Sequence, residues 1–347
     1  YRVLVCRPNH RLGNNLLLTP LITEIERLFK GAEIDIVSEG TVANAVFSTT
    51  YCLRNIYCLP TRGFKHPLAF LSLLARIRKT RYDLIIDPCV GSGFSRILTR
   101  LLHGRCKLGF VGSGGSSAKH SGLTHGAAVD VAGRHMAQRP INLLHWSLYG
   151  RAGTCRSGAP SQVFPPLDIR LTDDERARGR RHLAELLSRS GQTDYAPVIG
   201  IFANATGAKR YPQSWWNELI GVLKSRVPLC PIVEFIPMHG QSLLGSRWPA
   251  YYSSEIRRMA AVMAATDFMI SADCGVMHLA VASGTPTVGL FCTTDDEVYA
   301  PYGQASCALS TRQLSASAVA EQIAALFHRQ RVSPAHNASQ RARVEIQ

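Results

Sequence analysis

The chain has 347 residues, of which 46% are hydrophobic and 18% charged, so the composition excludes a disordered protein and suits two folded domains. The formal net charge of +15 favours a polyanionic partner, although solubility alone would also account for it. Aromatic residues are not interleaved with the basic ones, so we expect an anionic membrane or glycan and no nucleic acid. No apolar run reaches the roughly 18–20 residues of a membrane-spanning helix.

The first half of the chain alternates short apolar runs with amphipathic stretches, which predicts a parallel sheet covered by helices on both faces. Residues 1–7 enter the first strand without the layout of a signal peptide. Residues 112–134 are rich in Gly, Ser and His and lack periodicity, so we predict a long loop there. The predicted strands are 3–6, 34–37, 55–59, 84–87 and 106–111, and the predicted helices are 15–29, 67–79 and 94–103.

The second half repeats this pattern after a segment rich in Gly, Ser and Pro. We therefore predict a first domain at 1–150, a linker at 151–170, a second domain at 171–330 and a polar tail at 331–347. A cleft is expected between the carboxyl ends of the two sheets, where open α/β sheets bind ligands. The predicted strands are 198–202, 231–236, 268–271 and 287–291, and the predicted helices are 171–188, 215–225, 254–265, 275–282 and 315–329.

The ten cysteines are scattered, with no CxxC pair and no Cys/His cluster at zinc spacing. Reduced thiols packed as small hydrophobic residues in a cytoplasmic protein are the expected interpretation. We expect peripheral contact with the cytoplasmic face of an inner membrane, since the charge is high and no spanning helix is predicted.

The strongest chemical signal is the strand–turn–helix at 271–291. Free amides in the first helical turn, together with the helix dipole, form an anion site there, and Gly275 lets an anion approach the backbone closely. Asp273 could cap the turn or hold a sugar hydroxyl, and His278 could donate to a phosphate oxygen. The alternative is an ordinary turn, with Asp273 as N-cap and His278 as a satisfied interior histidine.

This segment resembles the nucleotide-sugar motif of glycosyltransferase family 9, the ADP-heptose:lipopolysaccharide heptosyltransferases. The family pattern is roughly D-[ST]-G-x-x-H-[LI]-A-x-A-x-x-x-P. Cys274 replaces the usual Ser or Thr, so it loses a strong hydroxyl donor but keeps the backbone amide. The matching residues are Asp273, Gly275, His278, Leu279, Ala280, Ala282 and Pro286.

Residues 7–20 resemble the family's N-terminal loop, in which G-D-x-[LIV]-[LM]-x-[TS]-P opens the first helix. The family's aspartate, taken as the catalytic base, falls on Asn14 here. An amide cannot accept a proton from a sugar hydroxyl at a useful pKa. The positions that fit are Gly13, Leu16, Thr19 and Pro20.

Two weaker matches extend the resemblance along the chain. Residues 82–87 followed by 107–110 resemble Y-D-x-x-[IV]-D … [RK]-[IL]-G-[FY], and residues 205–216 resemble the family's second-domain loop. In that loop Lys209 would reach the donor diphosphate, assisted by Thr206 and neighbouring amides. A solvated lysine is the alternative if the loop is taken alone.

The resemblance implies a GT-B fold, with two Rossmann-like domains that bind the donor in the second and the acceptor in the first. It implies inverting, metal-independent transfer of heptose from an ADP-linked nucleotide-diphosphate sugar to a lipopolysaccharide-type acceptor. No cofactor is implied beyond this co-substrate. The sequence has no Asp-x-Asp motif to bind a metal ion. The acidic segment 295–297, which follows a predicted strand, is the alternative place for one.

The sequence does not single out one residue as the base that takes the proton from the acceptor hydroxyl. His10, Asp87 and Glu39 are candidates, and Asn14 could instead only orient the acceptor. Arg62 and Lys65 could bind acidic acceptor groups or simply be solvated. A catalytically inactive nucleotide-sugar-binding relative is the alternative function. The sequence contains neither the glycine-rich motif of a dinucleotide-binding oxidoreductase nor that of a P-loop NTPase, so these two enzyme classes are not expected.

Overall fold

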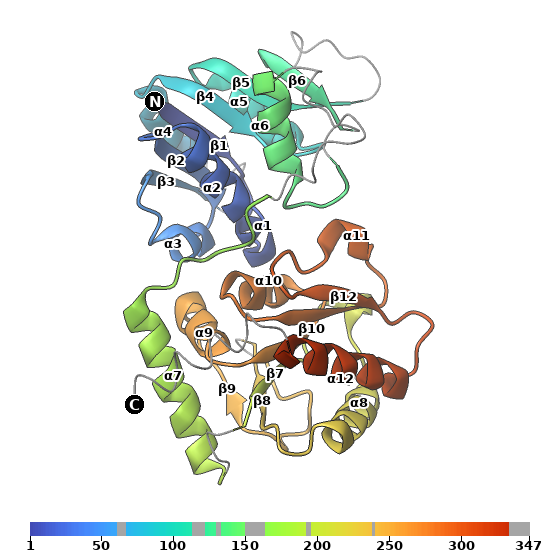
Figure 1. Ribbon diagram of the computed structural model, residues 1–347. Coiled ribbons are helices and arrows are strands. Elements are labelled where there is room, and N and C mark those ends of the chain that lie inside the picture. Colours follow the sequence, from blue (N-terminus) through green and yellow to red (C-terminus); the bar gives the residue numbers. More distant parts are fainter. Residues whose placement is uncertain are drawn as a thin grey trace. The chain divides into compact units, whose positions relative to one another are not determined.

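The computed structural model describes residues 1–60, 67–112, 122–129, 133–149, 164–191, 196–237 and 240–332. The chain divides into two compact units, Tyr1–Arg170 and Leu171–Gln347. Each unit contains a six-stranded sheet in which every strand pairing is parallel (Figure 1).

The sheet of the first unit has the strand order β3-β2-β1-β4-β5-β6. Its central strand β1 is apolar from Val3 to Cys6, and these four side chains are completely buried, as a strand covered on both faces requires. The strands are β1 (Arg2–Cys6), β2 (Glu33–Glu39), β3 (Leu53–Leu59), β4 (Tyr82–Asp87), β5 (Gly104–Val111) and β6 (His125–Ala128). The helices are α1 (Leu12–Leu16), α2 (Thr19–Leu28), α3 (Val42–Phe47), α4 (Pro67–Arg78), α5 (Gly93–Leu101) and α6 (Arg139–Tyr149).

The connections of this sheet first run outward from β1 to β3 and then return to β4 on the other side of β1. Because parallel crossovers are right-handed, α2 and α3 lie on one face and α4 and α5 on the other. The core beneath α4 and α5 includes residues from both helices and from the strands: Leu4, Cys6, Leu59, Leu73, Leu74, Ile77, Ile85 and Leu98.

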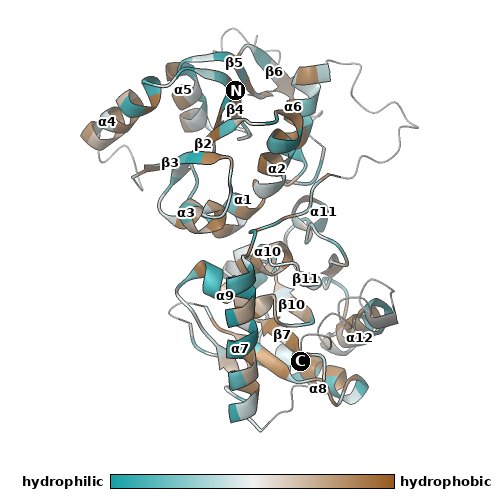
Figure 2. Ribbon diagram, turned by 60° about the vertical axis from the view of Figure 1, so that its left-hand side comes forward, coloured by the Kyte–Doolittle hydropathy of each residue, from teal (hydrophilic) through white to brown (hydrophobic). Residues whose placement is uncertain are grey.

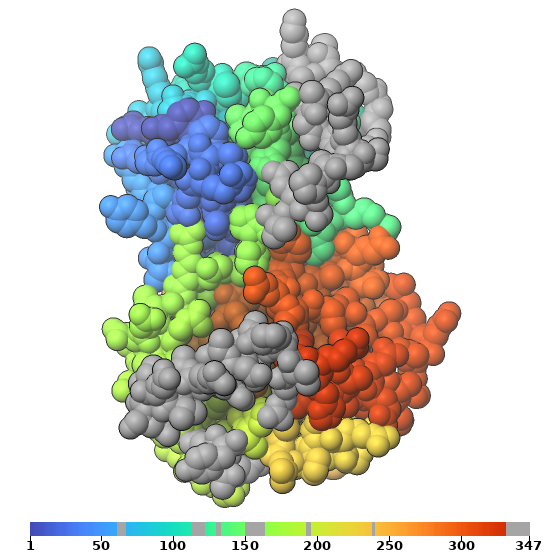
Figure 3. All heavy atoms as spheres, viewed as in Figure 1, coloured from blue at the N-terminus to red at the C-terminus, as the bar shows by residue number. Residues whose placement is uncertain are grey.

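The second unit repeats the design with the strand order β12-β11-β10-β7-β8-β9. Helices α8 and α12 pack side by side over a core centred on Trp216 (Figures 1 and 3). The strands are β7 (Ile199–Phe202), β8 (Ile232–Phe235), β9 (Ala250–Tyr251), β10 (Phe268–Ala272), β11 (Thr287–Phe291) and β12 (Cys307–Ser310). The helices are α7 (Asp173–Arg189), α8 (Gln213–Arg226), α9 (Ile256–Met263), α10 (Gly275–Ala282), α11 (Asp296–Tyr299) and α12 (Ala316–Val332), with a short 3₁₀ turn, η4 (Gly207–Lys209).

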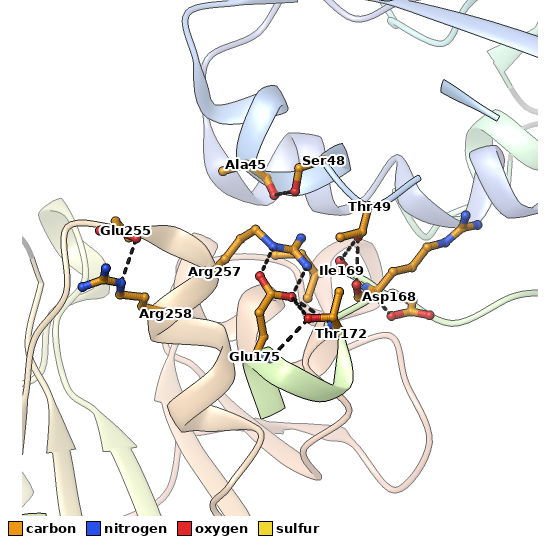
Figure 4. A network of polar contacts seen from close by, with 11 residues as sticks. Ala45, Ser48, Thr49, Asp168, Ile169, Thr172, Glu175, Glu255, Arg257 and Arg258 are labelled. Carbon is orange, nitrogen blue, oxygen red and sulfur yellow. Dashed lines mark hydrogen bonds and ion pairs between the residues drawn. The ribbon is translucent and has the colours of Figure 1, made fainter. Parts of the chain in front are cut away.

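Helix α7 is anchored at its start by a capping box, in which Thr172 and Glu175 bond each other's backbone amides. The Glu175 carboxylate also pairs with Arg257 of α9, with Oε1 2.6 Å from Nε (Figure 4). The helices approach closely enough that a Cβ at Gly179 would overlap the Ala261 carbonyl. This contact positions α9, which leads into β10.

Residues 164–170, part of the predicted linker, belong to the first unit and are bonded to its helices and loops. The Thr49 hydroxyl donates to the Arg170 carbonyl at 2.8 Å (Figure 4), and the Arg170 guanidinium pairs with Glu26. The Asp168 amide donates to the Thr19 hydroxyl at 3.2 Å. The other residues of the predicted linker, 151–163, lie outside the described residues.

The structure corrects three local predictions. The helix predicted at 15–29 is divided into α1 and α2, with Pro20 at the start of α2. Strand β6 lies inside the predicted loop 112–134; its sequence, His-Gly-Ala-Ala, has no apolar run that would indicate a strand. Helix α12 continues to Val332, two residues into the predicted tail.

Strand order reverses between β1 and β4 in the first sheet and between β7 and β10 in the second. Loops diverge from the carboxyl ends of such strand pairs, so ligands of open α/β sheets bind there. The residues that follow these four strands are therefore the candidates for a site. No helix within the described ranges is long and apolar enough to cross a membrane.

Candidate functional site

The reversal point of the second sheet brings together two residues from distant motifs. Phe202 at the end of β7 pairs with Ser271 near the end of β10, so the loops after both strands start side by side. Lys209 lies on the first loop and Asp273 on the second. The Lys209 ammonium is 2.7 Å from Asp273 Oδ2. The structure thus joins the two motifs into one ion pair at the expected binding edge.

The two members of this pair differ in exposure. The Asp273 side chain is only 6% exposed, whereas that of Lys209 is 34% exposed. A buried carboxylate is costly without a cation beside it, so Asp273 holds the ammonium in place. Because an ammonium has three donors and the Lys209 side chain is partly exposed, it can also donate to a phosphate oxygen.

The loop that carries Lys209 is shaped by η4. Gly207 adopts a φ of +61°, a conformation that side-chain-bearing residues seldom take, and this lets the chain turn after Thr206. Thr206 is exposed on this loop. The Ala208 carbonyl accepts a contact from the Cys292 thiol at 3.4 Å, which ties the loop to the end of β11. Lys209 is therefore held on a turn that is attached to the sheet.

Helix α10 starts directly after Asp273. Cys274 is its N-cap, in an extended conformation and without a side-chain cap bond, and Gly275 is the first helical residue. Both are partly exposed. Burial raises the pKa of the Cys274 thiol, so the side chain stays neutral and adds no negative charge. The first-turn amides and the helix dipole therefore form an anion site beside Lys209.

His278 lies deeper than its neighbours in the motif. It is 4% exposed, and the rest of α10 from Met277 to Ala282 is buried as well. The helix is pressed against β11, where a Cβ at Gly289 would overlap the Met277 sulfur. His278 is thus part of the interior of the second unit, one turn behind the exposed start of α10.

The reversal point of the first sheet is built around Arg7, which directly follows β1. Its guanidinium donates to Asn14 Oδ1 at 3.2 Å and to the Cys89 sulfur at 3.6 Å. Cys89 follows β4, so Arg7 spans the two central loops. The sequence did not single out Arg7, because one arginine after a strand has no distinctive spacing.

The loop from Arg7 to Arg11 is held by buried polar groups. Asn15, which is completely buried, donates to the carbonyls of Asn9 and Arg11, and Ser38 donates to Asn15 Oδ1. His10 lies on this loop with a side chain that is 57% exposed. Its Nδ1 is 3.3 Å from Glu39 Oε2 at the end of β2. A loop carrying an exposed imidazole next to a carboxylate is therefore fixed beside Asn14.

Asp87, another candidate base, is fully enclosed. Its carboxylate accepts from the Ser95 hydroxyl at 2.6 Å, from Arg96 Nε at 3.2 Å and from the Cys89 amide at 3.2 Å. Burial raises its pKa, but no part of the side chain is accessible to an acceptor hydroxyl. Asp87 thus organises the end of β4. Arg62 and Lys65 lie outside the described residues.

Acidic and metal-ligating side chains do not cluster in the part of the chain that the structure describes: no three His, Cys, Asp or Glu residues gather there as a metal site would require. In the segment 295–297, Asp295 serves as the N-cap of α11 and accepts from the Glu297 amide at 3.0 Å. Its carboxylate is used by the helix start.

Part of the second unit is similar to a known protein family. Residues 254–327, which include β10 and α10, match the model of glycosyltransferase family 9 (heptosyltransferase). This segment of the chain is therefore similar to glycosyltransferase family 9. The resemblance that the motifs predict is thus confirmed for the segment that carries Asp273 and the start of α10.

Solved structures match over nearly the whole chain. A family 9 glycosyltransferase from Veillonella parvula is 17% identical with a TM-score of 0.74, covering 95% of this chain and 98% of that one. E. coli heptosyltransferase WaaC with ADP is 20% identical with a TM-score of 0.68, covering 94% and 100%. E. coli ADP-heptose lps heptosyltransferase II is 16% identical with a TM-score of 0.68, covering 96% and 100%. The predicted α/β GT-B fold is confirmed. No curated protein sequence matches the chain significantly.

Proposed function

We propose that this family 9-like enzyme transfers heptose from an ADP-linked sugar to a lipopolysaccharide-type glycan acceptor, with inversion and without a metal. The observation that carries the proposal is the Lys209–Asp273 pair beside the open start of α10. Two solved structures with the same fold are an E. coli heptosyltransferase with ADP and the same enzyme with ADP-2-deoxy-2-fluoro heptose.

The donor diphosphate is placed at the first turn of α10 in this proposal. Lys209 would pair with a phosphate oxygen, and the amides at Cys274 and Gly275 would bind the same group. Thr206 would add a hydroxyl donor from the loop. Negative charge grows on the diphosphate as the sugar leaves, and a fixed cation with aligned amides stabilises that charge. Because His278 is only 4% exposed, its proposed role is to support the first turn of α10 from the interior.

The acceptor hydroxyl is assigned to the first unit, beside the Arg7–Asn14 contact. Asn14 cannot take its proton, but it can hold the hydroxyl in position. His10 is the proposed base because its imidazole is exposed on the adjoining loop and Glu39 lies 3.3 Å from Nδ1. Glu39 fixes the ring and stabilises the imidazolium that forms, while Nε2 faces the acceptor.

The competing proposal is an inactive relative that binds nucleotide-sugars. It would follow if loss of the family's aspartate at Asn14 had no compensation. The exposed His10–Glu39 pair in the same loop region favours the active enzyme. We also propose a cytoplasmic location, and the +15 charge supports peripheral contact with an anionic membrane, where a glycolipid acceptor would be found.

Ligand-induced stabilisation tests the donor assignment. A ligand that binds only the folded state raises the melting temperature, so ADP and ADP-heptose should do so, whereas UDP-N-acetylglucosamine should have a smaller effect. ADP release in the presence of a heptose-acceptor glycan, with and without EDTA, then tests transfer and metal independence. Turnover that disappears in EDTA and returns with Mn²⁺ would overturn the metal-independent mechanism. No stabilisation by any ADP ligand would overturn the donor assignment.

A further inference from the structure

One face of the first sheet is covered by α4 and α5, and the outer sides of these two helices carry large apolar side chains. Leu68 is 82% and Leu71 57% exposed on α4, and Ile97 is 58% and Leu101 40% exposed on α5. These side chains are not needed for the fold, because other residues of the same helices form the core. A cluster of exposed large apolar residues marks an interaction surface.

The two helices are in contact through one pair of aromatic side chains that also pack against the core. Phe70 of α4 and Phe94 of α5 are in contact, with ring centroids 5.8 Å apart. The inward side of α4 is filled by Leu73, Leu74 and Ile77. Figure 2 shows α4 as a mixture of brown apolar and teal hydrophilic segments at the edge of its unit. We call the outer side of α4, α5 and the loop that follows α4 the α4–α5 surface.

The stretch of chain that forms the α4–α5 surface is strongly basic. Between residues 67 and 107 the only acidic residues are Asp83 and Asp87. Asp87 is completely buried against Arg96, and Asp83 accepts from the Arg2 amide at 2.8 Å. The exposed basic residues of this stretch are Arg76, Arg78, Lys79, Arg81, Arg100 and Arg105.

A hollow at the C-terminal end of α4 combines both kinds of side chain. It has a volume of about 450 Å³ and is lined by Leu71, Leu74, Ala75, Arg78 and Lys79. Apolar walls beside two cations fit the boundary between a lipid phosphate and its acyl chains.

We propose that the α4–α5 surface docks on an anionic lipid bilayer, with Leu68, Leu71 and Ile97 entering the acyl boundary while the surrounding cations contact lipid phosphates. Charge complementarity selects this occupant. A second copy of the chain would bring another +15 and repel the first, and nucleic acid offers no apolar phase for the leucines. The docking rests on the proposed peripheral membrane contact and assigns a surface to it, and vesicle binding can be measured without transferase activity.

Vesicle sedimentation tests the docking. The full chain is mixed with vesicles of phosphatidylcholine alone or of phosphatidylcholine with 30% phosphatidylglycerol. Wild type should sediment only with the anionic vesicles. Leu68→Ser/Leu71→Ser should weaken the partition coefficient at least ~10-fold through lost apolar burial. Lys79→Glu/Arg81→Glu should weaken it by at least ~10-fold through lost charge attraction.

Matched controls come from the second unit. Leu229→Ser removes an equally exposed leucine, and Arg180→Glu/Arg181→Glu makes the same charge change on exposed positions of α7. Both controls should bind nearly as wild type, and all variants should melt at the wild-type temperature. The proposal is overturned if the controls weaken binding as much as the α4–α5 variants do. It is also overturned if the leucine variant binds normally, or if it instead loses a dimer in sedimentation velocity.

Discussion

The two sheets have the same design: each has six parallel strands, and the strand order reverses beside a central strand, between β1 and β4 in the first and between β7 and β10 in the second. In the second unit, a lysine after β7 meets an aspartate after β10. In the first unit, Arg7 after β1 meets the neutral Asn14. The second reversal point thus carries a charge pair, whereas the first carries a neutral amide at the position where the resembled pattern has an aspartate. We therefore expect the proposed donor site to follow the family pattern more closely than the proposed proton-transfer site does.

The largest expected effect lies in the first unit. His10→Ala should lower the transfer kcat by about 10²–10⁴-fold, since this is the usual contribution of a general base. Donor affinity should not change, because His10 and the Lys209 loop belong to different units. Initial rates of ADP release at saturating donor and acceptor measure the first quantity, and calorimetry measures the second.

Glu39→Gln and His182→Ala complete that test. Glu39→Gln keeps the hydrogen-bonding shape but removes the charge that stabilises the imidazolium, so the rate should fall less than in His10→Ala. His182 is exposed on α7, so His182→Ala should leave the transfer rate unchanged. If His10→Ala transfers at the full wild-type rate, His10 is not the general base and the first unit has no proposed substitute for the family's aspartate.

The next largest effect is expected at Lys209 in the second unit. Lys209→Ala should weaken ADP-heptose binding by about 10–150-fold, the effect of losing one charge-assisted contact. The carboxylate of Asp273 would also be left unpaired and close to the diphosphate. Isothermal titration calorimetry measures the change, with Arg180→Ala as a control for loss of positive charge.

The double variant Lys209→Met/Asp273→Asn separates two causes. It removes the cation without stranding a buried carboxylate, so its melting temperature should exceed that of Lys209→Ala. If Lys209 binds phosphate, donor affinity stays weak in the double variant. Recovered affinity there would mean that Lys209 only neutralises Asp273.

The smallest expected effect concerns the ion pair that positions α9. The Arg257 guanidinium holds the pKa of Glu175 down, to about 2. A carboxylate whose pKa is lowered on folding stabilises the protein above its ordinary pKa of 4.5 and loses this contribution as the pH falls toward 2. Glu175→Gln should therefore lower the melting temperature by about 2–6 °C at pH 7, with the difference shrinking in acid.

Glu185→Gln is the matched control, because Glu185 lies on the same helix but is 62% exposed. It should change the melting temperature little at any pH. Equal melting temperatures for wild type and Glu175→Gln at pH 7 would show that the pair contributes nothing to the second unit. Differential scanning calorimetry at several pH values gives both answers.

The sequence predicted much of the fold because buried parallel strands are short and apolar, as in β1 and β10. It failed for β6, where His-Gly-Ala-Ala pairs with β5 through backbone contacts that no side-chain pattern announces. Motif spacing predicted Lys209 and Asp273 separately. Their contact depends on β7 and β10 being neighbours, although 64 positions separate the two residues, so only the topology reveals it.

The sequence also left Asp87, Glu39 and His10 as equal candidates for the base. They differ through burial, which the linear pattern does not show. Asp87 is enclosed by Ser95 and Arg96, while His10 is exposed. Arg7 went unnoticed because a single arginine after a strand has no distinctive spacing.

Transfer by wild type and by Asn14→Asp, on the same acceptor glycan with ADP-heptose as donor, tests the central claim most directly. A carboxylate at position 14 would lie beside the Arg7 guanidinium, which would lower its pKa and weaken it as a base. We therefore predict that wild type is active and that Asn14→Asp gives no gain. An inert wild type whose activity appears in Asn14→Asp would contradict the account and identify the natural protein as an inactive donor-binding relative.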